Sequence, residues 1–231
     1  MNVIADKAAE RGPVLTVRDL SHGFKGGAAV VAIPHLALPA GGLTVLTGAS
    51  GSGKTTLLYL LAGLMPVQLG AIDWAGTDLA QLSERRRDRW RRAHAGFLFQ
   101  DFHLLPELSP LDNVLLPVWF TAFSARNHRP RAEALLADFG VPLRKRTADL
   151  SRGEQQRTAL ARALLTEPAV IFADEPTASL DAAAGQVVAQ SLRDLARGEG
   201  RMVIAASHDP ALVALADRRL HLEHGKLAQC G

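Results

Sequence analysis

The chain has 231 residues, enough for one large domain or two small ones, and 48% of them are hydrophobic, as in a globular protein with a buried core. The formal net charge is only +3, which excludes the dense basic surface of a dedicated nucleic-acid-binding protein. The single cysteine, Cys230, excludes a disulfide within the chain and indicates a reducing compartment. No segment reaches the run of about 18 apolar residues that a membrane-spanning helix needs, so any role at a membrane requires a partner.

The first third of the chain alternates charged segments with short apolar runs. Residues 1–13 carry charges without an apolar core, which is unlike a signal peptide and predicts a short flexible tail. Strands are predicted at 14–20 and 30–38, separated by a turn at Gly26 and Gly27. The β-branched run 43–47 indicates a buried parallel strand, and a helix is predicted from Lys54 to about Leu64. The arginine-rich run 85–92 predicts a solvated helix face or, alternatively, a surface for phospholipid headgroups or an acidic partner.

A helical segment interrupts an alternating pattern of strands and helices. After a strand at 97–99, residues 101–167 show helix-like runs at 111–123, 131–139 and 154–166, punctuated by prolines. Strands return at 170–173, 202–205 and 219–222, and they alternate with helices at 182–197 and 210–216. This order predicts an α/β fold with a mostly parallel sheet covered on both faces and an inserted helical region.

One glycine-rich segment matches the phosphate-binding loop at every fixed position. Its glycines let backbone N–H groups surround phosphate oxygens, and the N-terminus of the following helix adds partial positive charge. Lys54 should reach the β- and γ-phosphates, and the Thr55 hydroxyl should bind Mg²⁺. The predicted ligands of the nucleotide in this segment are Gly48, Ala49, Ser50, Gly51, Ser52, Gly53, Lys54, Thr55 and Thr56.

Two adjacent acids follow the buried strand 170–173. Because the carboxyl ends of parallel strands meet beside a phosphate loop, Asp174 is expected to hold Mg²⁺ through its waters. Glu175 is expected to orient and polarise the attacking water. In isolation the two acids could equally mark a strand that ends in solvent.

Ser151 and Glu154 are spaced as a capping box that begins a helix. The segment around them, Leu150-Ser151-Arg152-Gly153-Glu154, also resembles the signature of ABC transporter ATP-binding subunits. Further features follow the order found in that family, over residues 14–226: Phe24, the phosphate loop, Gln100, the signature, the two acids, Asp181 in Ser-Leu-Asp, and His208 after a strand.

This resemblance implies a P-loop NTPase (RecA-like) fold, with a mostly parallel core sheet, an N-terminal antiparallel β-subdomain and an α-helical subdomain inserted at about 101–167. Residues 14–231 would then form a single nucleotide-binding domain. The resemblance also implies ATP and Mg²⁺ as ligands and a head-to-tail homodimer around two ATP molecules. In that dimer the phosphate loop of one copy faces the signature of the other, and dimer opening and closing drive a separate membrane permease.

The resemblance assigns the remaining roles residue by residue. Phe24 would stack on adenine, although the aromatic residue in this place is commonly Tyr, and Asp181 would lie at the dimer seam. His208 would contact the γ-phosphate, and Gln100 would serve both catalysis and the metal. Ser151, Gly153 and Glu154 would contact the nucleotide of the partner. The signature usually carries two glycines, and Arg152 replaces the first of them.

The segment from Arg89 to Pro117 resembles the ATPases of lipoprotein-releasing, macrolide-exporting and cell-division systems. Such a subunit would lie at the cytoplasmic face of the inner (plasma) membrane, held there by its permease. Phe102, Leu104 and Leu105 would either line the groove for a permease helix or pack the core of the helical insertion. Amino-acid importers share parts of the pattern and remain an alternative.

A soluble ABC ATPase acting on nucleic acid is a further alternative, but such proteins carry long coiled coils that this chain lacks. No nucleic-acid partner is therefore expected. A translation factor needs two cassettes, and a kinase or GTPase outside the family leaves the signature unexplained.

Overall fold

A computed structural model describes residues 14–24, 29–119, 125–143, 146–178, 180–198 and 200–228. The predicted tail, the turn at Gly26 and Gly27, Ser179 and Cys230 lie outside these ranges. Two sheets share the strands, one with four strands in the order β2-β1-β4-β5 and one with six in the order β10-β9-β3-β8-β7-β6. The strands are β1 (Leu15–Gly23), β2 (Ala29–Leu38), β3 (Gly42–Thr47), β4 (Leu69–Trp74), β5 (Thr77–Asp78), β6 (Ala95–Leu98), β7 (Val170–Asp174), β8 (Met202–Ala206), β9 (Arg218–Glu223) and β10 (Lys226–Leu227).

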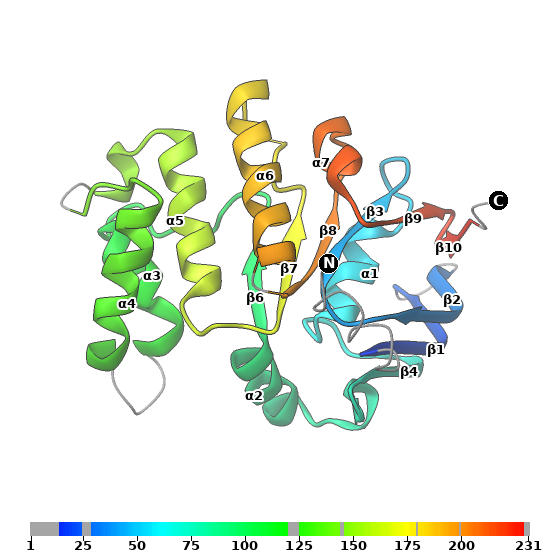
Figure 1. Cartoon of the computed structure of the whole chain (residues 1–231). Helices are drawn as coiled ribbons and strands as arrows, with labels where there is room; N and C mark the ends of the chain where they lie inside the picture. The colour runs from blue at the N-terminus through cyan, green and yellow to red at the C-terminus, as the bar shows by residue number, and fades with distance from the viewer. Residues whose placement is uncertain are drawn as a thin grey trace, which may run out of the picture.

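The helices divide between the core sheet and one end of the molecule. They are α1 (Lys54–Leu61), α2 (Glu84–His94), α3 (Pro110–Trp119), α4 (Ala125–Asp138), α5 (Arg152–Leu164), α6 (Ala182–Gly198) and α7 (Pro210–Leu215), with short 3₁₀ turns at Leu79–Gln81 and Thr147–Asp149. Figure 1 shows α3 and α4 beside α5 at the end opposite the antiparallel sheet. Among the described residues, none of the helices is long and apolar enough to span a bilayer.

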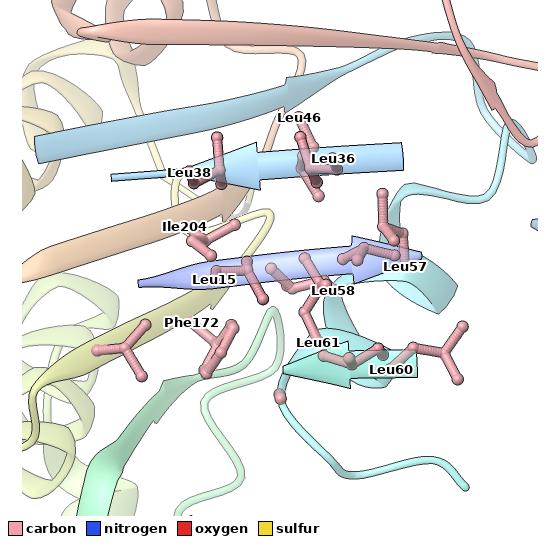
Figure 2. Packing of buried hydrophobic residues seen from close by; sticks show 14 of the residues in the cluster. Leu15, Leu36, Leu38, Leu46, Leu57, Leu58, Leu60, Leu61, Phe172 and Ile204 are labelled. Carbon is pink, nitrogen blue, oxygen red and sulfur yellow. The ribbon is translucent and has the colours of Figure 1, made fainter. Parts of the chain in front are cut away.

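The central strands β3, β7 and β8 of the core sheet are buried on both faces because they are mostly apolar. β6, β7, β8, β3 and β9 are parallel to one another, and every residue of β7 and β8 is buried. Phe172 and Ile204 face α1 and the antiparallel sheet (Figure 2). Ile171 and Val203 face the opposite cluster, which α5 and α6 complete. A third cluster joins α3, α4 and α5, so the helical region has its own core. The predicted α/β fold is therefore confirmed.

The antiparallel sheet contains strands that the hydrophobic pattern did not predict. β4 pairs with β1, and the register shifts between Arg18 and Ser21. Asp19 there has a φ of 48° and Gly70 a φ of 90°, and a Cβ on Gly70 would lie 2.4 Å from Asp19 O. β4 was missed because it is short and its pairing partner lies about fifty residues away in the chain. β5 in this sheet and β10 at the edge of the core sheet have two residues each, too few to show a hydrophobic pattern.

Helix boundaries also differ from the prediction. α1 ends at Leu61, three residues early, because Gly63 adopts a left-handed φ of 66°. α4 begins at Ala125 and contains Pro130, which the prediction had placed before the helix. The arginine-rich run forms α2. Arg87 and Arg91 are partly buried and form ion pairs with the exposed Glu84, whereas Arg85, Arg86 and Arg89 are exposed, as expected for a solvated face.

Candidate nucleotide-binding site

The phosphate loop lies between the carboxyl end of β3 and the start of α1, as predicted. Gly48 has a φ of 145°, and a Cβ there would lie 2.2 Å from Leu222 O. Gly53 has a φ of 100°, and a Cβ there would lie 2.7 Å from Val30 O. Both positions therefore require glycine, because the loop is pressed against neighbouring backbone.

Lys54 is folded onto the loop that it follows. Its Nζ donates to Gly48 O over 2.9 Å and to Ala49 O over 3.1 Å, and the residue is buried. Ser52 Oγ is also buried and has no hydrogen-bond partner within the described part of the chain. A buried ammonium and an unsatisfied hydroxyl beside a loop of backbone N–H groups fit a phosphate, which is a stronger acceptor than a peptide carbonyl.

Thr55 and Asp174 bring two oxygen ligands together. Thr55 Oγ1 donates to Asp174 Oδ1 over 2.9 Å, and Tyr59 also hydrogen-bonds to Asp174. Burial raises the pKa of Asp174, as does the nearby charge of Glu175, while the hydrogen bonds and Lys54 act in the opposite sense. The pKa of Tyr59 is raised to about 12, mainly by burial and then by the charge of Asp174. Hydroxyl and carboxylate oxygens are the donors that Mg²⁺ prefers.

The donor set also indicates how such an ion would be held. Within the described residues, no group of three or more His, Cys, Asp and Glu side chains could hold a metal ion by itself. Mg²⁺ is commonly bound by one or two protein oxygens together with substrate phosphates and waters. Thr55 and Asp174 fit that mode, since they lie next to the phosphate loop.

Glu175 leaves β7 in a strained conformation with a φ of 43°. Its backbone N–H is fixed by a 2.8 Å hydrogen bond to Ala206 O. His208 Nδ1 lies 3.0 Å from Glu175 Oε2. Oε2 is buried and accepts no hydrogen bond within the described residues. The Glu175 side chain is only 15% exposed, whereas that of His208 is 74% exposed.

A cleft of about 640 Å³ collects many of the predicted residues. Thr56, Gln100, Glu175 and His208 line it together with most of the phosphate loop. Sequence reasoning missed Val30 and Ala178 in its wall. It also missed Tyr59 beneath Asp174, although Tyr59 follows Thr55 by one helical turn and shares its face.

Other predicted residues lie outside this lining. Phe24 is 58% exposed and packs edge-on against His22, at 5.7 Å between ring centroids. Asp181 Oδ1 accepts a 2.9 Å hydrogen bond from Ala184 N at the start of α6. Neither side chain contributes to the cleft wall in the single chain.

The signature segment begins α5, with Ser151 and Arg152 exposed and Gly153 and Glu154 half-buried. Ser151 Oγ accepts from Glu154 N over 3.3 Å, and Glu154 Oε2 accepts from Ser151 N over 2.7 Å, so the predicted capping box is present. Ser151, Gly153 and Glu154 do not line the cleft of their own chain. Arg152 lies over the ring of Phe102, with Cζ 5.5 Å from the ring centroid.

The expected groove-lining residues are corrected by the structure. Phe102 is 2% exposed and belongs to the core cluster that contains α5 and α6, and Leu104 is partly buried against the same cluster. Leu105 alone is exposed, at 47%. The pattern could not separate these residues, since an apolar run after a strand suits a core as well as a groove.

Comparisons with known proteins agree with this geometry. Residues 32–178 match the family described as ABC transporter. The chain is 39% identical over 223 residues to the lipoprotein-releasing system ATP-binding protein LolD of Bordetella pertussis, covering 94% of this chain and 96% of that protein. It is 36% identical to the macrolide export ATP-binding/permease protein MacB of Psychrobacter cryohalolentis, covering 94% of this chain and 33% of that longer protein.

Solved structures give the same result. The ATP-binding cassette MJ0796, in a dimeric post-hydrolysis state bound to ADP and Pi, superposes with a TM-score of 0.84 at 30% identity, covering 93% of this chain and 97% of that chain. The phosphate loop, the acids after β7 and the separate signature segment thus occur in a fold and a sequence shared with known cassettes. The chain belongs to the ABC transporter family and is an ATPase cassette with relatives of the lipoprotein-releasing and macrolide-export types.

Proposed function

We propose that two copies of this chain enclose two ATP molecules head to tail and hydrolyse them. In each composite site, the cleft of one copy, with Lys54 and Glu175, faces Ser151 and Gly153 of the other. The proposal is supported by the exposure of Ser151 outside its own cleft and by the dimeric state of the cassette MJ0796. Because the signature does not line the cleft of its own chain, it can contact a nucleotide only in the cleft of a second chain.

The side chains of the cleft have distinct roles in this reaction. Lys54 moves from its loop carbonyls to phosphate oxygens, where its charge is better compensated. Glu175 accepts a hydrogen bond from the attacking water, since its carboxylate lines the cleft beside the phosphate loop. His208, 3.0 Å away, is placed to contact the γ-phosphate. Thr55 and Asp174, with Gln100 in the same cleft, would hold Mg²⁺, which would supply charge neutralisation for the phosphates.

Phe24 and Asp181 complete the proposed site. The exposed ring of Phe24 is available to stack on adenine, and His22 supports its edge. Asp181 accepts a hydrogen bond at the start of α6, six residues after Glu175. We place Asp181 at the dimer seam together with Glu154 of the signature.

The output of the cycle is transmitted to a membrane permease. A second cleft, of about 400 Å³, lies between α2 and β6 on one side and α3, α4 and α5 on the other. Phe97, Phe99 and Val118 give it an apolar wall, and Arg92, paired with Asp88 of the same lining, gives it a polar one. Such a groove suits the apolar face of a short amphipathic helix. The relatives LolD and MacB favour a permease of the lipoprotein-release or macrolide-export type, with the cassette at the cytoplasmic face of the inner membrane.

The observation that most strongly supports this function is that Lys54, Glu175 and His208 line the same cleft. The test compares Lys54→Ala with Lys226→Ala, since Lys226 is an exposed lysine on β10. Lys54→Ala should weaken binding of a fluorescent ATP analogue by about 10- to 100-fold, the value of charge-assisted hydrogen bonds, and abolish ATP-dependent pairing. Lys226→Ala should behave as wild type. Equal ATP affinity in the two variants, or hydrolysis by a chain that never pairs, would overturn the proposal.

A further inference from the structure

The turn that carries Gln100 into the cleft is held in an unusual backbone conformation. Phe102 and His103 have φ values of 59° and 47°, two consecutive left-handed residues without glycine. Phe102 N donates to Phe99 O over 3.0 Å, and the rings of Phe99 and His103 lie 4.8 Å apart. Such a conformation persists only where the surroundings enforce it.

Two arginines of α5 enforce it. Arg162 donates to His103 O over 2.7 Å and also to Phe102 O. Arg152, in the first turn of the same helix, places its guanidinium over the ring of Phe102 at 5.5 Å. The two arginines are separated by about 15 Å along the helix, since each residue rises about 1.5 Å. They therefore hold the Gln100 turn, through Phe102 and His103, from opposite ends of α5.

Resting on the proposed function, we infer that Arg152 is a positioning residue for the cleft of its own chain. It acts through Phe102 to hold Gln100 in place and does not bind the nucleotide of the partner. The position of the Arg152 guanidinium supports this, because it lies over the ring of Phe102, and Phe102 is two residues from Gln100 in the same chain. A glycine, which the signature usually carries in this place, could make no such contact.

This contact links two sites in one chain. The first turn of α5 carries Ser151 and Gly153 toward the partner, while Phe102 is two residues from Gln100. Arg152 therefore lies between the signature, which faces the partner's cleft in the proposed dimer, and the Gln100 turn of its own cleft.

The first test is a set of single and double variants of the full chain. Arg152→Ala should lower kcat by about two- to fivefold, the size of an exposed cation–π contact, and leave KM for ATP unchanged. Phe102→Leu, which keeps an apolar side chain, should do the same, and the double variant should lose no more than either single one. Arg152→Lys should restore part of kcat. Additive losses, or a loss confined to KM, would overturn the assignment, and thermal unfolding curves identify a Phe102→Leu chain that is merely unfolded.

The second test separates action on the same chain from action on the partner. Wild-type chains are mixed with an excess of Glu175→Gln chains, with or without Arg152→Ala, so that the active cleft is always wild type and only the opposing signature varies. The inference predicts equal turnover in the two mixtures, and a lower turnover with the double variant would refute it. Failure of the proposed dimer would appear separately, as chains that ATP does not pair, and the comparison of Arg152 with Phe102 would still decide the role of Arg152.

Discussion

Thr55 Oγ1 donates a 2.9 Å hydrogen bond to Asp174 Oδ1, across 119 positions of the chain. The contact joins the first turn of α1 to the last residue of β7, so the phosphate loop and the acidic strand end form a single unit. Burial of Asp174 makes its charged form costly, and the hydrogen bond donated by the Thr55 hydroxyl offsets only part of that cost. A site of this kind favours a bound cation.

A first prediction follows from this buried carboxylate. The pKa of Asp174 is raised in the folded chain, mainly because burial disfavours the charged carboxylate. The protonated form therefore contributes stability that is fully present below the ordinary pKa of aspartate and is lost as the pH rises through the folded-state pKa. At neutral pH, without nucleotide or metal, Asp174→Asn should therefore raise Tm while it abolishes turnover. The gain should shrink as the pH falls. Thermal unfolding from pH 4 to 8 measures it, with Asp194→Asn on the exposed face of α6 as the control. A gain that does not depend on pH would contradict this explanation.

The second prediction concerns Glu175. Glu175→Gln should reduce ATP turnover by about 10²- to 10⁴-fold, because the amide cannot accept a proton from the attacking water. ATP should then hold the chains as a stable dimer, visible by size-exclusion chromatography. Glu133→Gln, which removes only an exposed ion pair on α4, should leave both properties unchanged. Wild-type turnover in Glu175→Gln would assign the water to another residue.

The third prediction concerns Phe24. Phe24→Ala should weaken ATP binding by roughly 1–3 kcal/mol, the usual value of base stacking, without changing kcat at saturating ATP. Phe24→Tyr should bind ATP as wild type, since a phenol ring stacks equally well. Titration of a fluorescent ATP analogue provides the measurement. Unchanged affinity in Phe24→Ala would place adenine elsewhere.

The fourth prediction separates two roles of Ser151. Ser151→Ala removes the helix cap and should lower the free energy of unfolding by about 1 kcal/mol. Ser151→Asn retains a cap and should unfold like wild type in urea. Both variants should lose ATP-dependent pairing if the Ser151 hydroxyl also contacts the partner's nucleotide. A Ser151→Asn chain that pairs normally would limit Ser151 to its capping role.

Local features could be predicted because neighbouring residues determine them. The loop from Gly48 to Thr55 and the capping box of Ser151 and Glu154 depend on backbone angles and hydrogen bonds over a few positions. The alternation of strands and helices likewise required only the burial pattern of each segment. These patterns sufficed for the fold class and for most of the residues that line the cleft beside the phosphate loop, whose roles stay predictions.

The tertiary structure decided which distant segments meet. It placed Tyr59 under Asp174, buried Phe102 in the core and turned Arg152 onto it, and it paired β4 with β1. A pattern cannot supply such contacts, because an apolar run or an arginine has the same local preferences whether it faces solvent, a core or a partner. The raised pKa of Asp174 and the strained turn beside Gln100 arise only when the packed surroundings exclude water and fix the backbone.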